Sequence, residues 1–155
     1  MEMMQGRTPA DIVEGHFKEL EAKNFERARM FLADDFRYSG PGPRPMTPRE
    51  YIEMHRALMA GMPDLKYNVR IIGQQSNKIQ AAVRITGTHT GDVKLAFLGE
   101  EGTLKATGRS ISLAEEKVAA QVKDERIVQL RMDSSPHRGV LGVLRQLGVH
   151  LKKAG

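Results

Sequence analysis

Residues 61–85, GMPDLKYNVRIIGQQSNKIQAAVRI, contain the point at which the hydrophobic pattern of the chain changes its period. Apolar and polar residues alternate through Tyr67, Val69 and Ile71, and the alternation resumes after the polar turn at 75–78. A period of two is typical of a half-buried strand, and two such runs joined by a short polar turn predict a β-hairpin. We therefore expect helices before this stretch and a sheet from it onward.

Two helix starts upstream share one sequence pattern. Thr8-Pro9-Ala10-Asp11 and Thr47-Pro48-Arg49-Glu50 each place a hydroxyl at the N-cap, proline at the first helical position and an acid at the third. These residues satisfy the free amide groups of a first helical turn. We predict helices at 8–20, 24–32 and 47–61, the second closed by Asp34-Asp35, with a short strand at 36–39 and a loop at 40–45 between the last two.

The chain after residue 85 predicts further strands, because apolar runs alternate with Gly-rich or charged turns. Helices followed by consecutive strands, without βαβ alternation, indicate an α+β domain with an antiparallel sheet. A length of 155 residues suits one domain with one core. We expect a single domain over 1–155 with flexible ends at 1–7 and 152–155, strands at 93–97, 109–113, 118–122 and 127–132, and a last helix at 140–151.

Composition excludes several kinds of site. The chain has no Cys, which rules out disulfides, thiolate metal sites and cysteine nucleophiles. Its net charge of +5 is spread through every segment, whereas a nucleic-acid surface needs basic residues gathered on one face, so no nucleic-acid partner is expected. No metal site is expected either, because the five histidines lack the short helical spacing of zinc ligands: they lie at 16, 55, 89, 137 and 150.

The apolar stretches of the chain are all short. None approaches the roughly 20 residues of a membrane span, and the first residues lack a basic segment followed by an apolar one. We therefore expect no membrane contact and a cytoplasmic protein.

Four motifs occur in a familiar order: Gly61-Met62-Pro63-Asp64-Leu65, Gly87-Thr88-His89-Thr90-Gly91, Ala106-Thr107-Gly108-Arg109, and the ending from Arg126-Ile127-Val128 to Gly148. Together they resemble the SnoaL-like polyketide cyclase family over residues 8–150. The resemblance implies an NTF2-like cone, in which N-terminal helices pack on a curved antiparallel sheet and enclose a pocket. It also implies a homodimer formed on the outer side of the sheet, chemistry without a cofactor, and an aldol ring closure with an Asp near the end of the last long strand as acid and base.

The chain departs from the family pattern at that last strand. Family members run Ile-Val-Glu-His-Trp-Asp, whereas here Met132 stands in the place of the acid and Asp133 follows one residue later. Side chains alternate across a strand, so this shift turns Asp133 to the opposite face unless the backbone bulges. We expect Val128, Leu130 and Met132 to face the cavity, Met132 to be buried, and Arg131 to lie on the outer face.

Two residues are candidates for acid–base chemistry. A carboxylate at Asp133, if turned inward, lies beside apolar walls and can remove a proton next to a carbonyl; the alternative is turn formation by Asp-Ser-Ser-Pro. His55 lies at helical spacing between Ile52 and Met59, so its ring points into the pocket, as a proton carrier or as a satisfied core histidine. Glu115-Glu116 either supplies an acid from a strand bend or, as we favour, lies in solvent.

The remaining pocket candidates come from distant segments. His16 shares a helix face with apolar residues, and His89 reaches the pocket rim or pairs with a neighbouring strand. With these two, the side chains expected to contact a ligand are His16, Phe17, Tyr38, Met59, His89 and Met132.

Two functions fit these residues. The leading hypothesis is a cofactor-independent enzyme that moves a proton on an apolar carbonyl or ester compound, with Asp133 or His55 as the base. The alternative is a protein that binds or carries a small hydrophobic ligand without changing it, which needs only an apolar cavity and anchors such as Tyr38 or His55.

Overall fold

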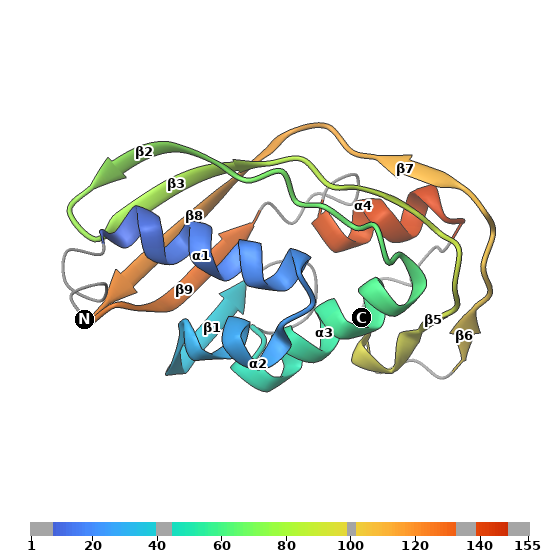
Figure 1. Ribbon diagram of the computed structural model, residues 1–155, viewed down its shortest axis with the longest axis horizontal. Helices are drawn as coiled ribbons and strands as arrows, with labels where there is room; N and C mark the ends of the chain where they lie inside the picture. The colour runs from blue at the N-terminus through green and yellow to red at the C-terminus, as the bar shows by residue number, and fades with distance from the viewer. Residues whose placement is uncertain (1–7, 40–44, 99–101, 133–138, 149–155) are drawn as a thin grey trace, which may run out of the picture.

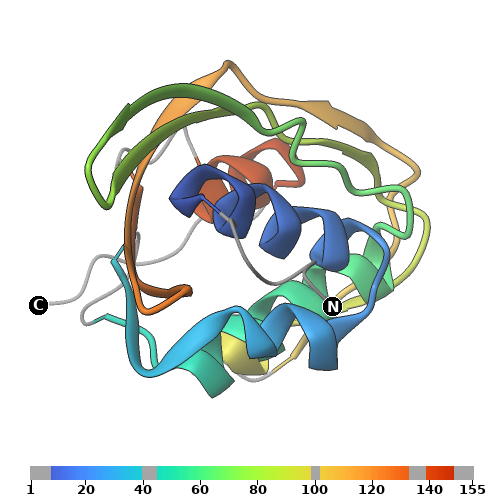
Figure 2. The same ribbon diagram turned by 60° about the vertical axis from the view of Figure 1, so that its left-hand side comes forward.

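The structure, a computed structural model, describes residues 8–39, 45–98, 102–132 and 139–148. Helices pack on the concave face of a strongly curved sheet, as Figures 1 and 2 show. The expected α+β class is confirmed. The helices are α1 (Pro9–Glu21), α2 (Phe25–Met30), α3 (Pro48–Gly61) and α4 (Gly139–Gln146).

Five strands form the main sheet in the order β1-β9-β8-β3-β2. Two short ladders, β4–β7 and β5–β6, continue the wall beyond it, and a 3-10 helix, η2 (Leu95–Leu98), follows β5. The strands are β1 (Leu32–Ser39), β2 (Arg70–Gln75), β3 (Lys78–Val83), β4 (Thr86–Thr88), β5 (Val93–Lys94), β6 (Thr103–Leu104), β7 (Ser110–Ser112), β8 (Glu116–Lys123) and β9 (Arg126–Met132).

Both predicted helix starts are confirmed. The Thr8 hydroxyl accepts from the backbone N–H of Asp11 at 3.1 Å, and the Asp11 carboxylate accepts from the backbone N–H of Thr8. Thr47 and Glu50 make the same reciprocal pair at the start of α3. Each capping box satisfies two backbone N–H groups of the helix start and contributes about 1 kcal/mol.

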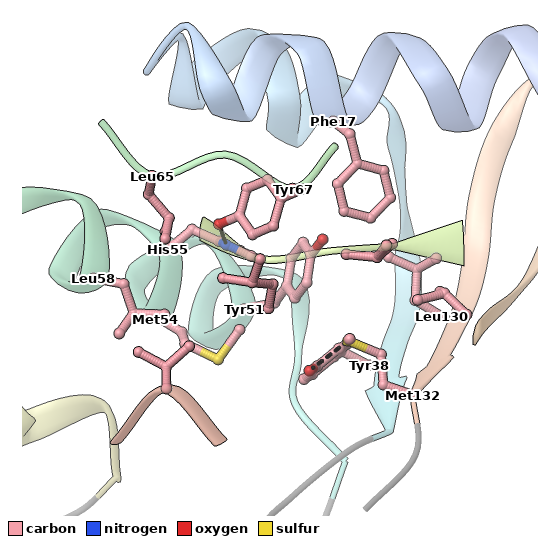
Figure 3. Close-up of a pocket in the computed structure, with 14 residues that line it drawn as sticks. Phe17, Tyr38, Tyr51, Met54, His55, Leu58, Leu65, Tyr67, Leu130 and Met132 are labelled. Carbon is pink, nitrogen blue, oxygen red and sulfur yellow. Dashed lines mark hydrogen bonds between the residues drawn. The ribbon is translucent and has the colours of Figure 1, made fainter. Parts of the chain in front are cut away.

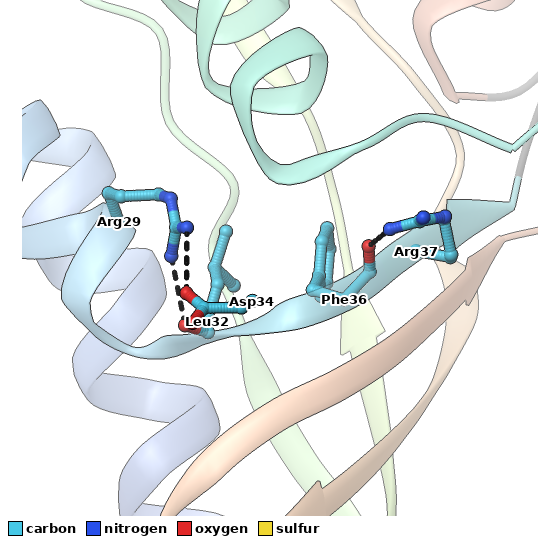
Figure 4. A network of polar contacts seen from close by, with 5 residues as sticks. All are labelled: Arg29, Leu32, Asp34, Phe36 and Arg37. Atoms are coloured by element: carbon cyan, nitrogen blue, oxygen red, sulfur yellow. Dashed lines mark hydrogen bonds and ion pairs between the residues drawn. The ribbon is translucent and has the colours of Figure 1, made fainter.

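The prediction of a helix through residue 32 is wrong, because α2 ends at Met30 and Leu32 begins β1. Leu32 is fully buried and pairs with Ile127 of β9. Arg29 secures the junction: its guanidinium donates to the Leu32 carbonyl oxygen at 3.0 Å and meets the Asp34 carboxylate at 3.3 Å (Figure 4). Pairing with a distant strand therefore outweighs the local helical pattern.

The sheet is mixed rather than antiparallel, which corrects a second expectation. β1 pairs with β9 in parallel, with Tyr38 opposite Leu130, whereas β9, β8, β3 and β2 pair antiparallel. Hairpins fix the β2–β3 and β8–β9 pairs, but β1 and β9 are far apart in the chain and no turn dictates their direction.

Smaller differences concern the ends of strands. Only Val93–Lys94 of the predicted strand at 93–97 is extended, since a 3-10 turn follows, and β6 was not predicted. The first hairpin strand spans Arg70–Gln75, so Tyr67 precedes the ladder although it is buried. The predicted ends at 1–7 and 152–155, and most of the predicted loop at 40–45, lie outside the described residues.

The motifs at 61–65 and 87–91, far apart in the sequence, contact each other in the fold. The backbone N–H groups of Thr90 and Gly91 both donate to the carbonyl oxygen of Gly61, the last residue of α3. A Cβ at Gly91 would lie 2.8 Å from the Ala60 carbonyl oxygen, and one at Gly61 would collide with Val93. The end of α3 can dock against this loop only because both positions lack a side chain.

We predict that Gly91→Ala destabilises the fold by about 1–3 kcal/mol, the cost of overpacking against backbone that cannot move aside. Urea unfolding followed by circular dichroism measures it. Gly73→Ala is the matched control, because its Cβ would meet nothing closer than 3.8 Å, and it should change the free energy of unfolding by less than about 0.5 kcal/mol. Equal effects of the two substitutions would contradict the close approach.

The outer face of the sheet is polar, with Gln80, Lys117, Ala119 and Arg131 exposed side by side on β3, β8 and β9. The homodimer through this face stays a prediction. Light scattering at micromolar concentration should then give twice the 17.3 kDa mass of one chain. Ala119→Arg should shift that mass to the monomer without altering the circular dichroism spectrum, because it adds a charge beside Arg131. A monomeric wild type would contradict the prediction.

Candidate functional site

A narrow apolar pocket lies between α1, α3 and the concave face of the sheet (Figure 3). The cavity within it has a volume of only about 20 Å³, enough for about one water molecule. A ligand therefore has to displace flexible side chains, and methionines are suited to this. The lining residues are Phe17, Tyr38, Tyr51, Met54, His55, Leu58, Leu65, Tyr67, Val83, Ile85, Val118, Leu130, Met132 and Val143.

His55 is the one histidine among the described residues that line this pocket. It follows Ile52 and precedes Met59 on the inner face of α3, and its ring is 5 % exposed. Its Nδ1 contacts the Tyr67 hydroxyl, while its Nε2 is buried and has no hydrogen-bond partner among the described residues. Burial, with a smaller effect of His16, lowers the pKa of His55 from 6.5 to about 3.

His55 and Tyr67 therefore form a neutral pair. Burial raises the pKa of the Tyr67 phenol well above 10, so neither group ionises near neutral pH. A phenol is a stronger acid than a neutral imidazole, and the Tyr67 O–H accordingly donates to Nδ1 of His55. In this tautomer Nε2 carries the remaining proton, a buried donor with no partner among the described residues.

His16 does not line the pocket, contrary to our expectation. Its Nδ1–H donates to the Ala28 carbonyl oxygen at 2.9 Å, and its Nε2 accepts from the Tyr51 hydroxyl at 2.9 Å. The ring is fully buried, and burial lowers its pKa from 6.5 to about 4. It is a satisfied core histidine that joins α1, α2 and α3.

The last strand turns Met132 toward the pocket, as its apolar neighbours predicted. Met132 is half-buried rather than fully buried as we expected, and its sulfur accepts from the Tyr38 hydroxyl at 3.2 Å. Val128 does not share that face. The pairing of β8 with β9 passes from Gln121–Gln129 to Val122–Ile127 and skips Val128. Ile127 is fully buried, whereas Val128 is only half-buried. This bulge lies near the start of β9, whereas residues 133–134, where a bulge would be needed to turn Asp133 inward, lie outside the described residues.

The other sequence candidates divide between the pocket and its surroundings. Phe17 and Tyr38 line it, whereas Met59 is buried in the core beside it. His89 is buried away from the pocket, where its Nδ1 accepts from the Thr107 backbone N–H at 3.2 Å. Asp133 lies outside the described residues.

Glu115 and Glu116 behave differently from each other. Glu115 is exposed and pairs with Arg70 at 2.9 Å, as expected of a solvated bend. Glu116 is only 3 % exposed, so that interpretation is wrong for it. The signal was present in the sequence, since the inward positions Val118, Ala120 and Val122 extrapolate back to Glu116 at a period of two.

The described residues contain no group of three His, Asp or Glu side chains arranged to hold a metal ion. Within the same part of the chain, no helix is long and apolar enough to cross a membrane.

The curved, open sheet, the helices on its concave face and the apolar pocket between them define an NTF2-like α+β cone. Residues 11–146 match the family model described as SnoaL-like polyketide cyclase. The chain therefore belongs to the SnoaL-like polyketide cyclase family. Among curated proteins, no chain matches it.

Solved structures repeat the fold at low sequence identity. IdmH, a proposed polyketide cyclase from Streptomyces antibioticus, is 23% identical with a TM-score of 0.69, over 92% of this chain and 100% of that one. A SnoaL-like polyketide cyclase from Agrobacterium tumefaciens is 20% identical with a TM-score of 0.65, over 92% and 99% of the two chains. An NTF2-like protein of unknown function from Cytophaga hutchinsonii is 18% identical with a TM-score of 0.56, over 87% and 96%.

The lowered pKa values of His16 and His55 predict acid sensitivity. The unfolded chain binds protons at these histidines below pH 6.5, whereas the folded chain does so only below about pH 4 for His16 and about pH 3 for His55. The free energy of unfolding should therefore fall as the pH drops from 6.5 toward 4, by up to about 3 kcal/mol from His16 alone.

Urea unfolding at a series of pH values measures this dependence, and NMR of the imidazole protons identifies the residues. The signals of His16 and His55 should stay constant from pH 8 to about 5, where exposed histidines titrate. Titration of either ring near pH 6.5 in the folded protein would contradict its burial as a neutral group.

Met132→Ala tests the pocket wall formed by β9. Because Met132 is half-buried, we expect a loss of about 1–2 kcal/mol, below the about 2–5 kcal/mol typical of a fully buried methionine. Met30→Ala is the control, since Met30 is 70 % exposed and should change stability little. Urea unfolding of both variants measures the difference, and equal losses would show that Met132 does not pack in the pocket.

Proposed function

We propose that this protein is a cofactor-independent enzyme that binds a small, largely apolar carbonyl compound and moves a proton on it. The observation that carries the proposal is the buried pair of His55 and Tyr67, with the unpartnered Nε2 of His55 set in an otherwise apolar wall. A buried polar atom without a partner costs free energy, and a ligand acceptor recovers it. A ligand carbonyl oxygen supplies such an acceptor.

The proposed proton transfer depends on the neutral protonation state of the His55 imidazole. Removing a proton next to a carbonyl places negative charge on the oxygen, and a fixed donor in a low-dielectric pocket stabilises that charge. A neutral imidazole whose pKa is lowered to about 3 suits this donor role. It is too weak a base to remove the proton itself, so a carboxylate is needed. Asp133, proposed from the sequence, and the buried Glu116 are the two candidates.

Membership of the SnoaL-like family supports a carbonyl-bearing substrate, and the similar structures from Streptomyces and Agrobacterium carry the description polyketide cyclase. A carrier of a small hydrophobic ligand is the second candidate function. It is favoured by one observation: among the described residues that line the pocket, none carries a charge, since His55 and the three tyrosines are neutral.

The probe for these functions is 2-tetralone, a bicyclic ketone with acidic α-protons, incubated with the protein in D2O. Binding should shift the NMR methyl signals of Met54 and Met132 in the pocket and leave that of the exposed Met30 unchanged. An enzyme exchanges the α-protons for deuterium faster than buffer does. Binding without exchange identifies a carrier, and the absence of any pocket shift contradicts both functions.

We predict that His55→Leu slows this exchange about 100-fold or more, because it removes the donor that stabilises the enolate oxygen. Tyr67→Phe should have a smaller effect, since it keeps the ring of His55 but removes the hydroxyl that fixes its tautomer. Met59→Leu is the matched control, a volume-conserving change on the same helix outside the pocket lining. Wild-type exchange in His55→Leu would contradict the donor role.

A further inference from the structure

We propose that Glu116 is the proton acceptor of the pocket, taking the proton from the carbon next to the carbonyl that His55 holds. This inference rests on the proposed function. It assigns the role of proton acceptor to a residue of β8, because β9, Arg126–Met132, contains no carboxylate. Three observations carry it: the burial of Glu116, its cross-strand partner, and its neighbour Tyr38.

Burial places the Glu116 side chain on the inner face of the sheet. It is 3 % exposed, whereas Glu115 next to it is exposed and bound to Arg70 on the surface. Burying a carboxylate is costly, and such groups are concentrated at functional sites. Of two adjacent glutamates, the fold keeps one in solvent and turns the other inward.

The strand pairing brings this carboxylate to the pocket. Glu116 of β8 lies directly opposite Val83 of β3, so their side chains share a face with Cβ atoms about 4.5–5.5 Å apart. Val118, two residues further along β8, shares that face as well. Both Val83 and Val118 line the pocket. Glu116, one position further along the same face, shares with Val118 and Met132 an open hollow that adjoins the pocket.

The position of Tyr38 indicates which side of the pocket is nearest to the Glu116 carboxylate. Met132, whose sulfur accepts from the Tyr38 hydroxyl, lies opposite Val118, two residues from Glu116 on the same face of β8. Burial and, secondarily, the charge of Glu116 raise the pKa of the Tyr38 phenol. Tyr38 lines the pocket beside Met132, as Figure 3 shows. The ring of Tyr51 stands 5.0 Å from that of Tyr38 and 4.5 Å from that of His55. A ligand lying along Tyr51 therefore has His55 at one end and Tyr38 at the other.

The proposed step balances without a cofactor. The bond from the α-carbon to hydrogen breaks, the proton passes to a Glu116 carboxylate oxygen, and the electron pair forms the carbon–carbon double bond of an enolate. The enolate oxygen accepts from Nε2–H of His55. Glu116 then returns the proton to carbon, or the enolate carbon attacks a second carbonyl of the same ligand and Glu116 protonates the new alkoxide.

The test compares Glu116→Gln with Glu115→Gln in the exchange of 2-tetralone α-protons in D2O. Glutamine keeps the size of the side chain but cannot accept the proton. We expect Glu116→Gln to bind the probe within about threefold of the wild-type Kd and to exchange it about 100-fold more slowly. Glu115→Gln should match the wild type in both. Glu116→Asp, which withdraws the carboxylate by one methylene, should retain binding and exchange at an intermediate rate.

The outcomes separate this inference from the function on which it rests. Wild-type exchange in Glu116→Gln overturns the role of Glu116 and leaves the enzyme proposal standing; if Asp133→Asn then abolishes exchange, Asp133 is the acceptor. A wild-type protein that binds the probe without exchange overturns both.

Should Glu116→Gln fail to fold, the wild-type protein labelled with ¹³C at glutamate carboxyls provides the second measurement. The Glu116 signal, identified by its absence from the spectrum of Glu116→Asp, should shift when the probe binds. A probe that shifts the methyl signals of Met54 and Met132 but not the Glu116 carboxyl overturns the inference.

Discussion

The two hydrogen bonds of His16 hold together the part of the domain on which the pocket depends. The ring donates to Ala28 of α2 and accepts from Tyr51 of α3, so one residue of α1 connects three helices in the core. Each bond uses a different nitrogen, which fixes a single neutral tautomer. A second proton on this buried ring would meet a hydroxyl that already donates to it. The helix arrangement is therefore tied to the neutral state of one imidazole.

The same contact orients the pocket. Because the Tyr51 hydroxyl is committed to His16, its ring is fixed in the pocket wall, packed on Tyr38 on one side and on His55 on the other. His55 is in turn held by Tyr67, which precedes the first hairpin. The polar atoms of this aromatic row largely satisfy one another, and Nε2 of His55 is the exception among the described side chains of the row. A row of mutually bonded rings thus leaves one donor for a ligand.

Local patterns in the sequence were sufficient for features that depend on local contacts. The capping boxes at Thr8 and Thr47 gave both helix starts, and alternation gave the inward direction of Leu130 and Met132. The sequence-based predictions were wrong where contacts with a distant segment determine the local structure. Leu32 leaves the helical pattern to pair with β9, and His16 turns from the pocket because its partners lie on two other helices. Glu116 was predicted to lie in solvent because it is charged, although the alternation of β8 places it on the inner face.

The parallel pairing of β1 with β9 also affects how the domain is made. Residues 32–39 can pair only after residues 126–132 are present, nearly a hundred positions later, and until then neither Leu32 nor the edge of β9 has its partner. Such a high contact order slows folding, because the entropy of closing a long loop is lost before the contacts form. On the ribosome, the N-terminal helices emerge well before the strand that completes their sheet. Until β9 is synthesised, the growing chain exposes an unpaired strand with an apolar face, the kind of segment that chaperones bind.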